Sequence, residues 1–322
     1  MSVLIFIDHA GGHIKKASLE AMSYGAAIAE QTGTTAEGII LGTVAEDLTA
    51  LGQYGVTKIH QIQHGDLKNF DAQVYAKAVA QAAEQMDARV IIFSNNTVGK
   101  AIAPRLSVRL KAGLVAGAVG LPNTSNGFVV KKAVFSGKAF AHVEIKTLRK
   151  IISLNVNSFQ IINRGAALAE VVPFNTTIEP SKLNVTGTNK TSGSVALTEA
   201  ETVVSAGRGL KGPENWKMVE ELATVLGAGL ACSRPVADAH WRPHTEHVGQ
   251  TGIAIAPNLY IAIGISGAIQ HLAGVNRSKV IVVINKDAEA PFFKAADYGV
   301  VGDAFEIVPK MLEAVKKIKG VA

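Results

Sequence analysis

Short apolar runs alternate with segments of helical periodicity along most of this chain, and this alternation restricts the fold more than any other feature. Residues 3–8 (VLIFID) are apolar enough for a buried strand, and residues 15–33 repeat apolar side chains at helical spacing before a glycine. Strands that alternate with helices form a mainly parallel sheet covered on both faces. Further strands are predicted at 36–42, 58–63 and 89–95, and helices at 46–55, 71–87 and 98–111.

The pattern changes in the second quarter of the chain. Apolar and polar side chains alternate in residues 127–146 and 150–159, which predicts antiparallel strands added to the parallel sheet. Residues 186–201 are rich in Gly, Ser and Thr and interrupt the apolar rhythm, so we interpret them as a linker. The first domain is therefore predicted to span residues 1–185.

The alternation of strands and helices resumes after the linker. Residues 259–264 (LYIAIG) and 280–285 (VIVVIN) are continuously apolar, as buried parallel strands are. Residues 304–320 predict a final helix whose basic last turn complements the helix dipole. The sequence thus predicts an α/β protein of two domains, the second a doubly wound domain at 202–322.

Length and composition narrow the class of protein. A chain of 322 residues is long for one hydrophobic core, which favours two domains. Its net charge of +6 comes from basic residues that are scattered among acidic ones, so nucleic-acid binding is not expected. The single cysteine, Cys232, cannot form an internal disulfide. Residues 248–276 carry no Asp, Glu, Lys or Arg, but Pro257 and five glycines favour a strand, a turn and a helix over a membrane span. With no targeting segment seen, we expect a cytoplasmic protein that is not membrane-embedded.

Residues suited to an anion follow successive strands of the second domain. Arg208 stands between glycines after one strand, Ser233 and Arg234 follow the next, Ser266 lies where a glycine turn is expected to begin a helix, and Asn285 ends the run at 280–285. Ligands of open parallel sheets bind at the carboxyl ends of the strands, and N–H donors with fixed cations suit a pyrophosphate. The sequence predicts a nucleotide site, although its glycine spacing is not that of the common dinucleotide fingerprint.

Four long motifs in this region resemble the alpha subunits of electron transfer flavoproteins. They are VSAGRGL at 204–210, CSRPVADA at 232–239, residues 247–274 and residues 280–309, with looser similarity near the N-terminus at 8–22 and 147–150. The resemblance implies one FAD held by the second domain and a heterodimer with a beta subunit, which the first domain contacts as a scaffold. It also implies an electron carrier that turns over no substrate of its own.

The resemblance further implies the partners of electron transfer. Flavoprotein dehydrogenases such as acyl-CoA dehydrogenases would be the donors, and a membrane quinone reductase would be an acceptor. The sequence does not distinguish a bifurcating variant with a second FAD in the beta subunit. From the residues alone, an NAD-dependent enzyme and a nucleotide-binding module without a redox role stay open as alternatives.

The resemblance assigns roles to individual residues of the site. Thr251 would lie beside flavin N5, His271 beside the O2 edge and Arg234 near the isoalloxazine ring, while Asn285 and Asp303 would hold the ADP half. A cation or donor near N1 and O2 stabilises the negative charge of a reduced flavin, so Arg234 and His271 are expected to tune its potential. No catalytic acid or base is predicted. The cofactor-binding residues implied are Arg208, Ser233, Arg234, Val248, Gly249, Gln250, Thr251, Ser266, Gly267, Ala268, Ile269, Gln270, His271, Asn285 and Asp303.

Two histidines depart from the residues usual in that family. His240 replaces a common glycine, and His247 replaces a glutamine or another polar residue. Together with His244 they form a group of three, but no carboxylate or cysteine completes a recognisable metal-ligand spacing, so no metal is expected. The departure at His247 puts only its own side-chain contact in doubt.

Overall fold

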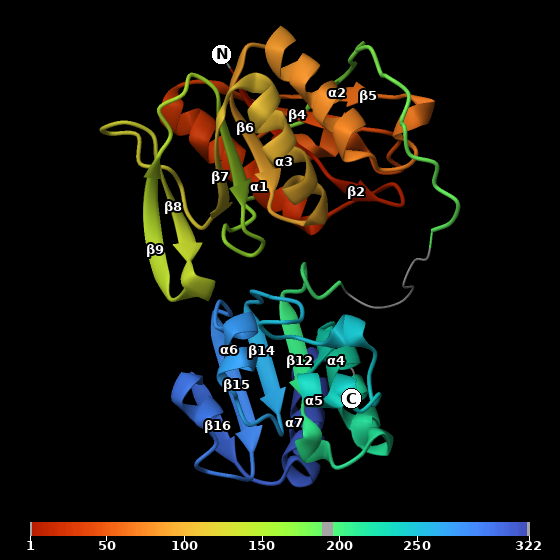
Figure 1. The fold of residues 1–322 in the computed structure, drawn as a ribbon, viewed down its shortest axis with the longest axis vertical. Helices are drawn as coiled ribbons and strands as arrows, with labels where there is room; N and C mark the ends of the chain where they lie inside the picture. The colour runs from red at the N-terminus through yellow and green to blue at the C-terminus, as the bar shows by residue number, and fades with distance from the viewer. Residues whose placement is uncertain (1, 189–195, 321–322) are drawn as a thin grey trace. The chain divides into compact units, whose positions relative to one another are not determined.

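The computed structural model describes residues 2–188 and 196–320, which form two compact units (Figure 1). The first unit contains residues 1–134 and 138–189, and the second contains 135–137 and 190–322. The linker predicted at 186–201 includes residues 189–195, which lie outside the described residues.

A nine-stranded sheet forms the first unit, in the order β11-β5-β4-β1-β6-β10-β7-β8-β9. Alternate residues of β1 enter two cores: Val3 and Ile5 pack with α1, whereas Leu4 and Phe6 pack with α2 and α3 on the other face. The sheet strands are β1 (Ser2–Phe6), β4 (Thr35–Leu41), β5 (Lys58–Ile62), β6 (Ala88–Ser94), β7 (Gly113–Ala118), β8 (Val129–Val134), β9 (Ala139–Glu144), β10 (Lys150–Leu154) and β11 (Glu170–Pro173), with a separate pair β2 (His9–Ala10) and β3 (His13–Ile14). The helices are α1 (Lys16–Thr32), α2 (Ala72–Gln85) and α3 (Thr97–Leu110), and the 3₁₀ turns are η1 (Leu48–Tyr54) and η2 (Gly65–Leu67). The 3₁₀ turn η3 (Phe135–Gly137) lies between β8 and β9 in the sequence and is assigned to the second unit.

The antiparallel addition to this sheet is shorter than predicted. Strands β8 and β9 form the antiparallel pair expected from residues 127–146. The prediction for residues 150–159 is wrong, because β10 lies between β6 and β7 and runs parallel to both. Ile151 and Ile152 belong to the cores on opposite faces of the sheet, which is the environment of an interior parallel strand rather than of a half-exposed one.

The second unit is a parallel five-stranded sheet in the order β13-β12-β14-β15-β16. The chain passes from β12 outward to β13 and then returns to β14 on the other side of β12, so the winding reverses between β12 and β14. This doubly wound arrangement confirms the predicted fold class. The elements are β12 (Thr202–Ala206), η4 (Arg208–Leu210), η5 (Pro213–Trp216), α4 (Lys217–Leu226), β13 (Gly229–Cys232), α5 (Arg234–Asp238), η6 (His244–Glu246), β14 (Leu259–Ile263), α6 (Ile269–Val275), β15 (Val280–Asn285), η7 (Pro291–Ala295), β16 (Tyr298–Val301) and α7 (Ala304–Lys319).

Helices cover both faces of this sheet as well. The core on one face includes residues of α4, α5 and α7, and the core on the other includes residues of α6. The uncharged segment 248–276 contains β14, a glycine turn and α6, as predicted. Within residues 2–188 and 196–320, no helix has both the length and the apolar character needed to cross a bilayer.

Asp71 joins the start of α2 to a segment far along the chain. Its carboxylate accepts hydrogen bonds from the backbone N–H of Gln73 (2.8 Å) and from the hydroxyl of Ser181 (2.6 Å), and the Ser181 bond is the main cause that lowers its pKa. We expect Asp71→Ala to lower the free energy of unfolding by about 1–2 kcal/mol in urea titrations. Asp47→Ala, which removes an exposed cap on η1, is the control, and equal losses would contradict the prediction.

Candidate functional site

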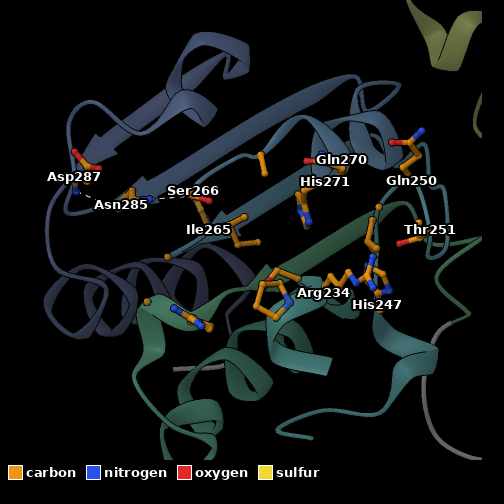
Figure 2. A pocket seen from close by; sticks show the side chains of 18 residues that line it. Arg234, His247, Gln250, Thr251, Ile265, Ser266, Gln270, His271, Asn285 and Asp287 are labelled. Carbon is orange, nitrogen blue, oxygen red and sulfur yellow. Dashed lines mark hydrogen bonds between the residues drawn. The ribbon is translucent and has the colours of Figure 1, made fainter. Parts of the chain in front are cut away.

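A pocket of about 710 Å³ lies in the second unit, at the carboxyl ends of its strands (Figure 2). Its walls come from the loops after β12, β13, β14 and β15. These loops surround the point between β12 and β14 where the winding of the sheet reverses. Doubly wound sheets usually bind their ligands at this point. The volume is that of a small-molecule or cofactor site. The lining residues are Arg208, Gly209, Ser233, Arg234, Pro235, His247, Val248, Gly249, Gln250, Thr251, Gly264, Ile265, Ser266, Ala268, Gln270, His271, Asn285 and Asp287.

All the predicted site residues except three line this pocket. Gly267 turns its backbone against Phe292, Ile269 is 64% exposed, and Asp303 caps α7 by accepting from the N–H of Phe305 at 2.9 Å. The lining residues absent from the predicted set are Gly209, Pro235, His247, Gly264, Ile265 and Asp287. Most of them are next in sequence to predicted residues, in glycine turns that follow strands. Their position in these turns was the sequence signal that could have identified them as pocket residues.

Two glycine loops cross at the floor of the pocket. The N–H of Gly207 donates to the carbonyl of Ile263 (2.9 Å), and the N–H of Gly209 donates to the carbonyl of Gly264 (3.1 Å). A Cβ atom on Gly207 would lie 2.4 Å from the Gly264 carbonyl oxygen. The loops after β12 and β14 therefore reach this separation only because no side chain stands between them.

The loop at 248–251 rests on α6. The N–H of Gln250 donates to the carbonyl of Gln270 at 2.7 Å, and a Cβ atom on Gly274 would lie 2.5 Å from the Gly249 Cα. Gly249 itself has φ +154°. This contact brings the loop and the helix to the same side of the pocket, where Figure 2 shows Gln250, Thr251, Gln270 and His271 together.

The helix predicted to begin at Ser266 begins at Ile269, so that prediction is wrong. Gly264 and Gly267 have φ of +60° and +82° and keep residues 264–268 in a loop. In the part of the chain that the structure describes, the backbone N–H groups of Ser266 and Ala268 donate to no protein acceptor. The loop thus offers unpaired donors to the pocket, one from Ser266 and one from Ala268, the residue that precedes α6.

Asn285 connects the loops after β14 and β15. Its side-chain amide donates to the carbonyl of Ile265 at 3.0 Å, and its side-chain oxygen accepts from the N–H of Asp287 at 3.1 Å (Figure 2). The Asn285 side chain thereby ties the backbones of the two loops together at this end of the pocket.

His271 is buried beneath the pocket, and Tyr260 is its neighbour. The Nε2 atom lies 2.7 Å from the Tyr260 hydroxyl, whereas Nδ1 has no hydrogen-bond partner among the described residues. Burial lowers the pKa of His271 to about 4, with a further lowering from His247. The Val248 carbonyl opposes this with a smaller contribution, but it does not meet hydrogen-bond geometry with the ring. The imidazole is therefore neutral at neutral pH, with one polar atom left for a ligand.

Arg234 and His247 stand at the opposite wall (Figure 2). The pKa of His247 is lowered by burial first and by the positive charge of Arg234 second. The Arg234 side chain is 63% exposed, and its Nε atom lies 3.3 Å from the Asp238 carboxylate. A largely exposed guanidinium, paired at Nε with Asp238, and an imidazole whose pKa is lowered therefore face the same cavity.

An arginine outside the pocket fixes the turn before His247. Both Glu246 oxygens accept from Arg242 at 2.7 Å, a Glu220 oxygen accepts at 2.5 Å, and the guanidinium stands 5.2 Å from the centre of the Trp216 ring. A bidentate pair with a second carboxylate holds a side chain more firmly than a single exposed ion pair. The network therefore stabilises the segment that leads into the 248–251 loop.

His271 gives the protein a defined pH dependence. Its folded pKa of about 4 lies below the unfolded value near 6.5, so the unfolded state takes up the proton first and stability falls as the pH drops from about 6.5 towards 4. At pH 5 the loss is about 2 kcal/mol. In urea titrations at pH 7 and pH 5, His271→Gln is expected to remove that part of the loss, whereas His244→Gln, at an exposed position, is the control. Equal pH dependence in wild type and His271→Gln would contradict this assignment.

Comparisons with known proteins agree with this geometry. The family model described as the electron transfer flavoprotein domain matches residues 3–178, and the model of the electron transfer flavoprotein FAD-binding domain matches residues 196–276. The chain belongs to the electron transfer flavoprotein family. The prediction from the four motifs is confirmed, and so is the predicted cofactor, FAD, because the FAD-binding model covers most of the loops that line the pocket.

Individual relatives place the chain among the alpha subunits of electron transfer flavoproteins. Subunit alpha of Thermoanaerobacterium thermosaccharolyticum is 34% identical over 324 residues, and that of Bacillus subtilis is 34% identical over 329 residues, with 98% of each chain covered in both cases. A probable mitochondrial subunit alpha of Cryptococcus neoformans is 34% identical over 99% of this chain and 93% of its own. The solved structure of Acinetobacter baumannii MurG, by contrast, aligns over 100% of this chain and 93% of its own with a TM-score of 0.32 and 11% identity, a likeness too weak to indicate a shared fold.

Proposed function

We propose that this chain is the FAD-carrying subunit of an electron-transfer heterodimer with a beta subunit, and that the pocket of the second unit holds the FAD. One observation carries the proposal: the pocket lies at the reversal point of the sheet and combines two arginines, unpaired backbone donors and an unpartnered imidazole nitrogen. These groups fit an anionic pyrophosphate at one end and a ring with carbonyl acceptors at the other.

The isoalloxazine ring would lie between Arg234 and His271, with Thr251 beside N5. Asn285 would lie at the ADP half, and Asp303 would contribute only through the start of α7, since its side chain is engaged as a cap. FAD supplies the reversible uptake of one or two electrons when bound. The residues of the chain orient the ring and stabilise negative charge on it, and none of them acts as an acid or base in this proposal.

The proposed partners follow from membership of the family. Flavoprotein dehydrogenases of the acyl-CoA dehydrogenase type would deliver electrons, and a quinone oxidoreductase would accept them, with no substrate turned over by this chain itself. The first domain, at 1–185, would be the scaffold that contacts the beta subunit, and residues 186–201 would link it to the FAD domain at 202–322.

An absorbance spectrum of the chain co-produced with a beta-type partner tests the central claim. We expect flavin bands and one FAD released per alpha chain on denaturation. A colourless heterodimer that takes up no added FAD would contradict the proposal and favour a nucleotide-binding module. Bleaching of the bands by an acyl-CoA dehydrogenase with its substrate, but not by the substrate alone, tests the proposed donor class and the carrier role separately from FAD binding.

A further inference from the structure

Tyr260 lies on β14, below the pocket, and does not line it. Its side chain is 0% exposed, and its hydroxyl oxygen lies 2.7 Å from Nε2 of His271. The ring of Phe292 packs against both partners, with ring centres 6.2 Å from Tyr260 and 5.7 Å from His271. The imidazole is therefore held in one plane by a fixed hydroxyl and a fixed aromatic ring.

The protons of this pair can be counted. Burial lowers the pKa of His271 to about 4 and raises the pKa of Tyr260, so at neutral pH the imidazole carries one N–H and the phenol keeps its hydrogen. Among the described residues, Nε2 of His271 is the one group that meets hydrogen-bond geometry with the Tyr260 hydroxyl. The buried Ser205 hydroxyl lowers the pKa of Tyr260 but does not meet that geometry. If Nε2 carried the proton, the phenol hydrogen would be left with the Ser205 hydroxyl, which does not meet hydrogen-bond geometry, in place of a ring nitrogen at 2.7 Å, and a poorly paired buried donor is costly. The phenol therefore donates to Nε2, and the proton of the ring lies on Nδ1.

We infer that Tyr260 is a positioning residue that fixes the His271 tautomer, so that the pocket meets a flavin acceptor with an Nδ1–H donor. This inference rests on the proposed FAD site. The opposite tautomer would turn a lone pair towards the carbonyl and ring-nitrogen acceptors at the N1 and O2 edge, where negative charge gathers when the ring is reduced. Tyr260 thus stabilises the reduced flavin relative to the oxidised one by orienting His271, although Tyr260 lies below the pocket and does not itself contact the flavin.

The test compares two phenylalanine variants in the heterodimer. Tyr260→Phe removes only the hydroxyl oxygen, and Tyr24→Phe is the matched control, because Tyr24 is equally buried and its hydroxyl donates to the Gly120 carbonyl in the first unit. We expect Tyr260→Phe to weaken the binding of reduced FAD about tenfold more than that of oxidised FAD, equivalent to a fall in two-electron potential of about 30 mV. Tyr24→Phe should leave the potential unchanged.

Nitrogen NMR of the histidine rings supplies the second readout and needs no bound FAD. In the wild type, the His271 signals should show the proton on Nδ1, and in Tyr260→Phe they should move towards the mixture or the other tautomer. A wild-type ring protonated on Nε2, or a Tyr260→Phe heterodimer with bound FAD and unchanged potential, would overturn the inference. A wild type that binds no FAD but shows the Nδ1–H tautomer would instead overturn the proposed function and leave the tautomer assignment standing.

Discussion

Replacing Gly264 by alanine is expected to raise the Kd for FAD by about 10- to 100-fold. Gly264 has φ +60°, and a Cβ atom there would lie 2.9 Å from the Gly209 Cα and 3.2 Å from the Gly209 carbonyl carbon. Both are backbone atoms of the crossing loop, so relief requires the loops after β12 and β14 to separate. Overpacking of this kind costs about 1–3 kcal/mol, and the displacement falls on the floor of the pocket.

Gly227→Ala is the matched control for that substitution. Gly227 ends α4 with φ +66°, nearly the angle of Gly264, but a Cβ atom there meets nothing within 4 Å. Both alanines carry the same cost of a left-handed conformation, and only Gly264→Ala adds the collision. Fluorescence titration of the unloaded heterodimers with FAD measures the difference. Equal Kd values for the two variants would show that the close crossing does not shape the site.

The strand-end residues of the site were predictable because parallel strands share one carboxyl edge. Arg208, Ser233 and Asn285 each follow an apolar run of the sequence, and a sheet of such runs brings them to one edge whatever the order of its strands. The order itself was not predictable. Strand β10 shows why: its interior position depends on packing against both β6 and β7, and its short mixed pattern is compatible with an edge strand as well.

The direction of individual side chains was the other feature of the site that the sequence could not predict. A contiguous motif from Ser266 to His271 does not indicate that Gly267 faces Phe292 or that Ile269 faces solvent, because both depend on the backbone of the loop. His247 was noticed only as a departure from the family, yet it lines the pocket. Tyr260 gave no signal at all, since an aromatic residue in an apolar run is indistinguishable from ordinary core.

Arg234→Ala is expected to lower the reduction potential of the bound FAD by tens of millivolts. A unit charge at ~4 Å with an effective dielectric constant of ~20 is worth about 4 kcal/mol, or roughly 170 mV for one electron, and this is the upper limit. The actual shift is smaller because the Arg234 side chain is 63% exposed and is screened by solvent and by Asp238. Spectroelectrochemical titration in low and high salt measures the shift, which should shrink as salt is added.

Two further variants separate charge at the ring from general damage to the site. Arg208→Ala removes a cation from the loop after β12 and should weaken FAD binding with little change in potential, since its proposed role is at the pyrophosphate. Asp238→Asn removes the carboxylate that lies 3.3 Å from the Arg234 Nε atom, so it should raise the potential, opposite in sign to Arg234→Ala. A potential that falls in all three variants would contradict the electrostatic role, because loss of the Arg234 cation should lower the potential and loss of the Asp238 carboxylate should raise it.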